Sequence, residues 1–536
     1  MNRRQFLRAG ALAGVVTVGT TVVGSAGAGR VAGAGAPHRA TASGTTMPNG
    51  TGTPTPTPTE AVATPTSDWE PSGSVAVPGA TETVLAPDGE TAFVAVGDGF
   101  AVLDLSDPTE PTVLTRETGI SPPGTDRELV QAFDVKHDDG ELLLAGPASY
   151  HPDSFRGVVR YDVTDPGAPE LVDAVETTYP VHNCCFADGL AYLTGNDDDR
   201  NPLVVVDLAG GGEVGRWSVL DGDDRWADVD QAVRRLHDVW VQDDLAYLAY
   251  WDAGTWIVDV SDPADPTAVA GITPIDPGTF EGKSYLERYR ETKEPPGNVH
   301  YVATDPAGEL LAVGKETWNS NAGLEGTTPG PDDPGGPSGI DLYDVSDPTE
   351  PTELATIEPP ATADPNVGGV WTTAHNFEVG ERYLYSSWYE GGVKVHDLGD
   401  PTNPREVRYF RRSSTTSFWT AQLTSPGGSV VASSRYNPAD LDAPAVVYTF
   451  PDVPRETPTA TPADTERPPT SAPATADTET QSGNEPTGTR PGDEPAGTLP
   501  GDGTTGGDGP GFGPLAALAG LGVGAWRLLG GGDDEQ

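Results

Sequence analysis

The stretch Val258–Pro266 reads VDVSDPADP, and this nine-residue phrase returns along the whole central part of the chain. Four other copies are clear and two are degenerate: Leu103–Pro111, Tyr161–Pro169, Tyr343–Pro351 and His396–Pro404, with weaker copies at Val206–Ala209 and Tyr448–Asp452. The second residue of each copy falls at positions 104, 162, 207, 259, 344, 397 and 449, so most spacings are 45 to 58 residues and one is 85. A period in this range is typical of a repeat architecture.

The phrase has the pattern of a strand that runs into a turn. Alternating apolar residues such as Val258 and Val260 favour a half-buried strand. Asp262 and Pro263 then end it, because the aspartate side chain can cap a turn and proline lacks the N–H that a ladder needs. Before each phrase come an apolar run, a turn and a second apolar run. Each unit is therefore predicted to hold four short strands, and seven units fit between about Ser74 and Asp452, which predicts an all-β, seven-bladed β-propeller over residues 73–454.

The repeated phrase resembles the LVIVD-repeat family, whose signature is an apolar strand that ends in Asp-Ile/Val-Ser-Asp-Pro. The resemblance covers about 380 of the 536 residues, and five clean copies make it specific for the fold. It implies an extracellular propeller of a kind whose activity is mostly unassigned. It therefore implies architecture more than chemistry.

The composition restricts the partners. The chain has 81 Asp and Glu residues against 31 Lys and Arg residues, a formal net charge of −50 and two cysteines. Such an acidic surface would repel phosphates, which excludes nucleic acid as a partner. It is also the surface expected of a halophilic protein, because concentrated salt screens the self-repulsion. Two cysteines provide no disulfide framework.

The N-terminal region resembles an export signal followed by a linker. Residues 1–36 contain Arg3-Arg4-Gln5-Phe6-Leu7-Arg8 and then an uncharged apolar stretch, which is the pattern of a twin-arginine signal. Residues 37–72 are rich in threonine and proline, as in Thr53–Pro58, and are predicted to form an extended linker that buries no core.

The C-terminal region resembles a tethered stalk. Residues 455–509 are a disordered linker rich in Thr, Pro, Asp and Glu, and residues 510–536 are similar to a PGF-CTERM sorting signal that begins at Pro510-Gly511-Phe512. That resemblance implies removal of the tail by an archaeosortase-type enzyme and attachment of a lipid anchor. The acidic end Gly530–Gln536 departs from the usual basic ending. A plain membrane helix is the alternative, although Pro514–Leu529 is short for a span. Both alternatives place the propeller on the extracellular face of the cell membrane.

The last unit lacks an outer strand, and Ser74–Pro78 has the character to supply it and close the ring. In a four-stranded meander the long insertions all fall at one end of the propeller, which we call the decorated face. Arg225–Leu236 and Ser284–Arg290 are predicted to be helical, and Glu316–Gly339 is predicted to be a long loop. A localised function is expected on this face.

Four of the eight histidines occupy one position in their units, at the start of the inner strand: His182, His237, His300 and His375. Imidazoles from consecutive blades that meet at the axis could bind Fe, Cu, Zn or Ni. Glu316 and Glu390 are the carboxylates expected to orient them. The alternative is that each histidine bonds the backbone of a neighbouring blade, as a packing residue inherited by duplication. Cys184 and Cys185 are interpreted as small buried thiols, with Cys184 on the same side of its strand as His182.

No serine elbow, P-loop, HExxH or GxGxxG that follows a predicted strand occurs in the sequence, so hydrolase and nucleotide-binding functions have no support. The first hypothesis is a cell-surface-anchored propeller that acts as a binding or interaction module, with an unknown extracellular ligand. The alternative hypothesis is a metal-dependent enzyme, an oxidoreductase, with the four histidines as ligands. Aromatic residues on the decorated face, such as Trp251 and Trp388, could equally line a ligand pocket.

Overall fold

The computed structural model describes residues 69–320 and 335–453. The predicted signal (1–36), most of the first linker, the stalk (455–509) and the sorting segment (510–536) lie outside these residues.

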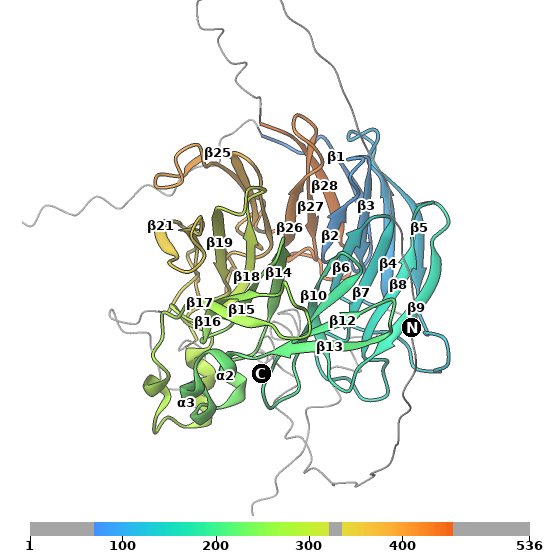
Figure 1. Ribbon diagram of the computed structural model, residues 1–536. Coiled ribbons are helices and arrows are strands. Elements are labelled where there is room, and N and C mark those ends of the chain that lie inside the picture. The colour runs from blue at the N-terminus through green and yellow to red at the C-terminus, as the bar shows by residue number, and fades with distance from the viewer. Residues whose placement is uncertain (1–68, 321–334, 454–536) are drawn as a thin grey trace, which may run out of the picture. The chain divides into compact units, whose positions relative to one another are not determined.

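The described strands form seven antiparallel sheets of four strands each, which confirms the predicted seven-bladed propeller (Figure 1). In blades one to six the chain runs from the inner strand outward. The strands of blades one to three are β2 Thr83–Leu85, β3 Thr91–Ala95, β4 Gly99–Asp104, β5 Thr112–Thr118; β6 Asp134–Asp138, β7 Glu141–Gly146, β8 Gly157–Asp162, β9 Glu170–Glu176; β10 Val181–Ala187, β11 Leu190–Gly195, β12 Leu203–Asp207 and β13 Gly212–Trp217. Those of blades four to six are β14 Asp238–Gln242, β15 Leu245–Tyr250, β16 Gly254–Asp259, β17 Thr267–Ile272; β18 Val299–Thr304, β19 Leu310–Lys315, β20 Ile340–Asp344, β21 Thr352–Ile357; β22 Phe377–Val379, β23 Tyr383–Ser387, β24 Val393–Asp397 and β25 Arg405–Phe410.

The seventh blade is closed by the N-terminal strand. Its own strands are β26 Phe418–Leu423, β27 Ser429–Ser434 and β28 Val446–Pro451, and β1 Gly73–Ala76 pairs with β28 as the outer strand. Just before β1, the Trp69 ring stacks on Phe450 at 4.6 Å and its Nε1–H donates to the carbonyl oxygen of Pro451 at 2.8 Å. The predicted closure of the ring is confirmed, and it leaves β28 paired on both sides.

The repeated phrase forms the third strand of a blade and two consecutive turns capped by aspartate. In blade four the carboxylate of Asp259 accepts the N–H of Ser261 at 2.9 Å, and that of Asp262 accepts the N–H of Ala264 at 3.0 Å. The same pair of bonds recurs in blades one, two and five. The sequence predicted this role, because aspartate side chains mimic a backbone turn.

The core lies between neighbouring blades. Middle strands are buried on both faces, as in β3, where every residue is buried, because each blade packs on a neighbour at either side. One interblade cluster joins Phe93 and Phe100 of the first blade to Leu142 and Tyr161 of the second. Outer strands such as β5 are mostly exposed.

The decorated face carries the insertions, as predicted, but with less helix. Helix α3 Tyr285–Glu291 matches the predicted helix, and α2 Val219–Gly222 lies near it at the lower edge of the view (Figure 1). Arg225–Leu236 does not form one helix. It forms two short 3-10 turns, Asp224–Asp228 and Gln231–Val233, because aspartates cap each turn and restart the chain.

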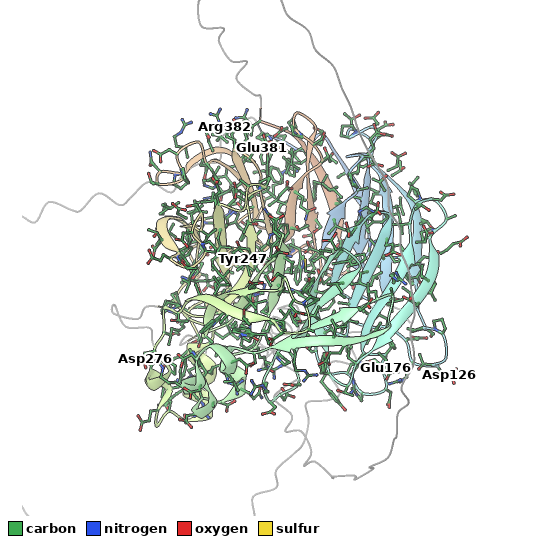
Figure 2. All side chains as sticks on the ribbon, viewed as in Figure 1. Asp126, Glu176, Tyr247, Asp276, Glu381 and Arg382 are labelled. Carbon is green, nitrogen blue, oxygen red and sulfur yellow. The ribbon has the colours of Figure 1, made fainter. Side chains whose placement is uncertain are left out.

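The opposite end carries tight turns. Figure 2 shows Glu381 and Arg382, in the turn between β22 and β23, at the top of the view, and Asp276, in the loop after β17, at the bottom. Within the part of the chain that the structure describes, no helix is long and apolar enough to cross a membrane.

Candidate functional site at the propeller axis

The four histidines of the sequence pattern lie side by side at the inner edges of four consecutive blades. The ring centroids of His182 and His237 are 4.3 Å apart, those of His237 and His300 are 3.8 Å apart, and those of His300 and His375 are 4.9 Å apart. His182 and His300 fall where register shifts interrupt the pairing of β10 and β18 with their second strands. Such irregularities re-aim a side chain, and here they accompany side chains that meet at the axis.

Three of these rings are anchored on the backbone of a neighbouring blade: the preceding blade for His182 and the next blade for His237 and His375. Nδ1 of His182 lies 2.8 Å from the backbone oxygen of Ala148, and Nδ1 of His237 lies 2.8 Å from that of His300. Nδ1 of His375 lies 2.6 Å from the backbone oxygen of Trp419. The packing role considered for these histidines is therefore present. The hydrogen bond to the carbonyl also fixes the tautomer of each ring. Because a carbonyl oxygen can only accept, Nδ1 carries the proton and Nε2 keeps its lone pair. Backbone orientation of this kind is common in metal-binding histidines.

The axial histidines are neutral at neutral pH. Burial lowers the pKa of His182, and it lowers the pKa of His375 to about 3. Burial is the main reason why the pKa values of His237 and His300 lie well below their usual range, and the neighbouring imidazoles lower them further. A neutral imidazole is the form that binds a metal or accepts a hydrogen bond.

The structure does not bring the potential ligand atoms of all four histidines into one mutually close group. Among the described residues, one group of potential ligands has its atoms mutually within 4.8 Å, and it consists of His300, Glu316 and His375. His182 and His237 lie outside this group, and Nδ1 of each lies 2.8 Å from a carbonyl oxygen of a neighbouring blade. The four-histidine site expected from the sequence stays a prediction, and the compact group in the structure consists of two of these histidines and Glu316.

Glu316 follows β19, and one of its oxygens lies 3.4 Å from Nδ1 of His300. Its other oxygen accepts a hydrogen bond from the Tyr389 hydroxyl. Burial raises the pKa of Glu316 to about 7. Glu390 is buried too; its carboxylate accepts the Trp371 N–H at 3.2 Å and the Tyr436 hydroxyl at 3.4 Å, so it supports the aromatic residues of this face.

Two cations that the sequence did not single out face the same region. The guanidinium of Arg435 lies 5.0 Å from the Phe133 ring and 4.7 Å from the Trp419 ring. Nζ of Lys293 lies 4.6 Å from the Trp251 ring. Each comes from a loop of the decorated face, between β27 and β28 or between β17 and β18. A cation on an aromatic face keeps favourable electrostatics when it is partly removed from water.

Aromatic rings continue the line of histidines. Trp419 takes the histidine position in blade seven, and its ring lies 4.1 Å from that of His375. Tyr389 contacts His375 at 4.7 Å, and Trp318 and Trp371 contact each other at 4.2 Å.

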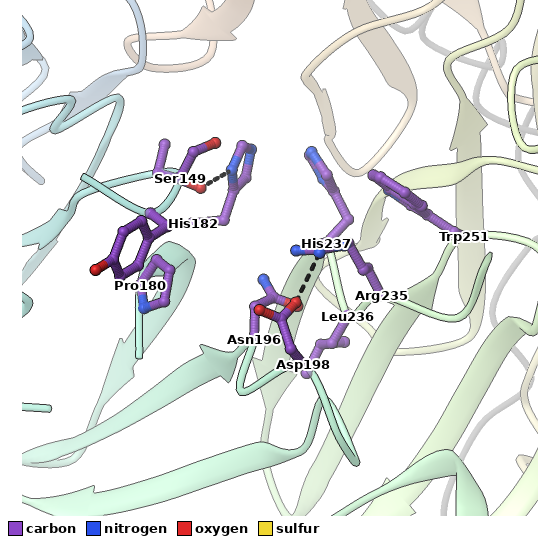
Figure 3. Close-up of a pocket in the computed structure, with 11 residues that line it drawn as sticks. Ser149, Pro180, His182, Asn196, Asp198, Arg235, Leu236, His237 and Trp251 are labelled. Carbon is purple, nitrogen blue, oxygen red and sulfur yellow. Dashed lines mark hydrogen bonds and ion pairs between the residues drawn. The ribbon is translucent and has the colours of Figure 1, made fainter. Parts of the chain in front are cut away.

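A pocket opens beside the first two histidines (Figure 3). Its walls come from blades two to four: Ala148, Ser149, Tyr150, Pro180, His182, Asn196, Asp198, Arg235, Leu236, His237 and Trp251. In Figure 3 His182 lies beside Ser149 and Pro180, and His237 lies between His182 and Trp251. Arg235 is paired with Asp198 at 2.8 Å, so the rim has a fixed, neutral ion pair.

A buried polar cluster lies one residue further along the inner strands. Lys136 is paired with Asp134, Asn183 donates to Asp238 at 3.1 Å, and Asn376 donates to Glu82. Burial raises the pKa of Glu82 to about 8 and that of Asp238 to about 7. Burial opposes the charge on Lys136, but Asp134 and Glu82 outweigh it and raise its pKa. These residues form a buried network of one ion pair and side-chain hydrogen bonds.

Both cysteines are buried free thiols, as interpreted from the sequence. Burial raises the pKa of Cys185 to about 11 and that of Cys184 well above its usual value, so neither is a ready thiolate. The strict alternation expected between His182 and Cys184 does not hold, because the register of β10 shifts between Val181 and Cys184.

The LVIVD repeat model matches residues 85–116 and 234–272, which are parts of blades one and four. No curated protein matches the chain. Solved structures that resemble this chain have low sequence identity to it. The β-propeller domain of Cps50 (Swd1) from Myceliophteria thermophila has 10% identity and a TM-score of 0.47, covering 72% of this chain and 100% of that one. The WD40 propeller of Doa1 has 13% identity and a TM-score of 0.43, covering 71% and 96%. A functionally unknown protein from Desulfotomaculum acetoxidans has 11% identity and a TM-score of 0.40, covering 62% of this chain and 84% of that one.

Its own strand topology and the two matches to the repeat model show that the chain is a seven-bladed β-propeller that contains LVIVD repeats.

Proposed function

We propose that this protein is a cell-surface-anchored propeller that acts as a binding module, with its binding site on the decorated face around the axial histidines. The supporting observation is the position of Arg435 and Lys293. In a chain with a formal net charge of −50, these two cations lie on aromatic rings beside the axis. The opposite end carries short turns capped by aspartate.

The arrangement suits a small ligand with an anionic group and a flat apolar part. Arg435 and Lys293 would bind the anion, and the rings of Trp251, Trp318 and Trp419 would contact the flat part. Because the surrounding surface is acidic, a larger anionic partner such as a nucleic acid would be repelled before it reached these cations.

Export by the twin-arginine route, a processed and lipidated C-terminus and a high-salt environment belong to this proposal. They are supported by Arg3-Arg4, by Pro510-Gly511-Phe512 and by the excess of acidic residues. An extracellular propeller held by a long Thr/Pro stalk would present its decorated face to ligands at the cell surface. The alternative, a metal-dependent oxidoreductase, requires a bound metal ion, and metal content is its first test.

The binding proposal is tested with benzoate, an aromatic carboxylate, by isothermal titration calorimetry on the purified full chain in concentrated KCl. Arg435→Met and Lys293→Met should each weaken binding by roughly tenfold or more, because each removes a charge-assisted contact. Arg382→Met is the matched control, since Arg382 pairs with Asp397 at the opposite end, and it should leave the affinity unchanged. Absence of benzoate binding to the wild type, or equal loss in the control, would contradict the proposal.

A further inference from the structure

We propose that His300, Glu316 and His375 bind one divalent first-row transition-metal ion at the axis of the propeller. The ion would lie on the face that we assign to ligand binding, so the proposal deepens that function and uses the same region of the molecule. Its ligand set, two imidazoles and one carboxylate from blades five and six, differs from the four histidines expected from the sequence pattern.

The first argument is the proximity of the three side chains. Their potential ligand atoms all lie within 4.8 Å of one another, and Nδ1 of His300 is 3.4 Å from the nearer Glu316 oxygen. Metal–ligand bonds of about 2.1 Å need ligand atoms separated by roughly 3 to 3.5 Å. One pair already has this spacing, and small side-chain rotations would bring in the third atom.

The second argument is that two of these nitrogens lack a hydrogen-bond partner in the described residues. Nε2 of His375 and Nδ1 of His300 are both buried and unsatisfied. A buried polar atom without a partner costs about 1–3 kcal/mol. Two such atoms beside a buried carboxylate are the arrangement that a bound cation would satisfy at once.

The third argument is that two of the three ligand side chains are held in place by hydrogen bonds through their other polar atom. His375 donates its Nδ1–H to the Trp419 oxygen at 2.6 Å, which leaves Nε2 as the free lone pair. Glu316 is held by the Tyr389 hydroxyl through its other oxygen. The backbone oxygen of His300 accepts a hydrogen bond from Nδ1 of His237 at 2.8 Å, and this bond fixes the start of β18. Contacts of this kind orient metal ligands and raise their affinity.

The donor atoms indicate the class of metal. Two imidazole nitrogens and a carboxylate suit Zn²⁺, Fe²⁺, Co²⁺, Ni²⁺ or Cu²⁺ and disfavour Mg²⁺ and Ca²⁺, which prefer oxygen donors. Three protein ligands leave coordination positions open to solvent or to a ligand. Lys293 and Arg435 carry positive charge near Glu316, so they oppose the binding of a cation. The same two charges would hold an anion at an open coordination position of the bound ion.

The test is the metal content and affinity of the purified full chain after removal of metals by a chelator. Zn²⁺ and Co²⁺ are titrated separately, with elemental analysis for stoichiometry and the visible absorption of Co²⁺ for the donor set. We expect one ion per chain. Glu316→Gln and His375→Ala should each weaken binding about 100-fold, and thermal unfolding of the metal-free variants shows that they are folded. Glu316→Gln keeps the shape of the side chain, so it remains informative if His375→Ala does not fold.

His182→Ala is the matched control, because His182 belongs to the line of histidines but lies outside the three-residue group. It should keep wild-type metal affinity. Equal loss in His182→Ala and His237→Ala, with Glu316→Gln unaffected, would overturn the assignment in favour of a four-histidine site. Absence of stoichiometric metal in the wild type would overturn the metal site altogether. Benzoate binding by the metal-free wild type separates the two proposals, since it tests Arg435 and Lys293 without the ion.

Discussion

Individual buried carboxylates at the axis are held in their protonated form by the fold. Glu82 is 1% exposed, it accepts a hydrogen bond from Asn376, and burial raises its pKa to about 8. The unfolded chain ionises this group near pH 4.5, whereas the folded chain keeps its proton up to about pH 8. The folded state therefore binds more protons in this window, and its stability falls as the pH rises from about 4.5 to 8.

Glu82→Gln should remove this part of the pH dependence, because glutamine resembles the protonated acid. At pH 5 the variant should match the wild type, and at pH 8 it should be more stable, by on the order of a few kcal/mol. Urea denaturation at the two pH values and constant salt measures the difference. Glu353→Gln, at an exposed position of β21, is the control and should leave the slope of stability against pH unchanged. The same slope in Glu82→Gln as in the wild type would show that Glu82 is ionised in the folded protein.

Among the elements, the closing strand joins the two ends of the described chain. β1 pairs with β28, and Trp69 adds a buried ring on Phe450 and a hydrogen bond to Pro451. The sequence predicted this strand, because the last unit was one strand short and an unpartnered apolar segment preceded the first. The helical prediction for Arg225–Leu236 was less successful, since the repeated aspartate caps of that insertion are local signals that interrupt a helix.

Trp69→Ala should destabilise the propeller by about 3 kcal/mol, because a buried aromatic ring is replaced by a methyl group. The contact with Phe450 and the hydrogen bond to Pro451 are lost with it. The loss is measured as a lower midpoint of chemical denaturation. Glu70→Ala is the neighbouring control. Glu70 forms an exposed ion pair with Arg412, so its removal should change stability by less than about 1 kcal/mol. A small effect of Trp69→Ala would indicate that the pairing of β1 with β28 is sufficient to close the ring.

At the scale of the whole molecule, the dominant property is the negative charge. A formal net charge of −50 gives a self-repulsion that concentrated salt screens over a few ångströms. We predict that the midpoint of thermal unfolding rises steadily as KCl increases from about 0.2 M to about 3 M. Sucrose of matched water activity, which adds no ions, is the control. An unfolding temperature that responds equally to salt and to sucrose would remove charge screening as the cause.

The sequence by itself determined the number of blades, the strand order within them and the closure of the ring. Each of these follows from a local pattern that recurs: alternating apolar residues, the Asp-Pro turn and the spacing of Asp104, Asp162 and their equivalents. It also placed the four histidines at equivalent positions, because equivalent positions of a propeller repeat face the same axis.

Only the tertiary structure decided which of these residues meet. His300 and His375 come within reach of Glu316, which belongs to an insertion after β19. The charge of Arg435, from a loop in the seventh blade, acts on both His375 and Glu316. Repeat periodicity says nothing about insertions, and ring orientation depends on register shifts in β10 and β18 and on carbonyls of the neighbouring blade. Local patterns that repeat along the chain therefore determine the fold. The site depends on single contacts between residues that are far apart in the sequence and have no equivalent in other repeats.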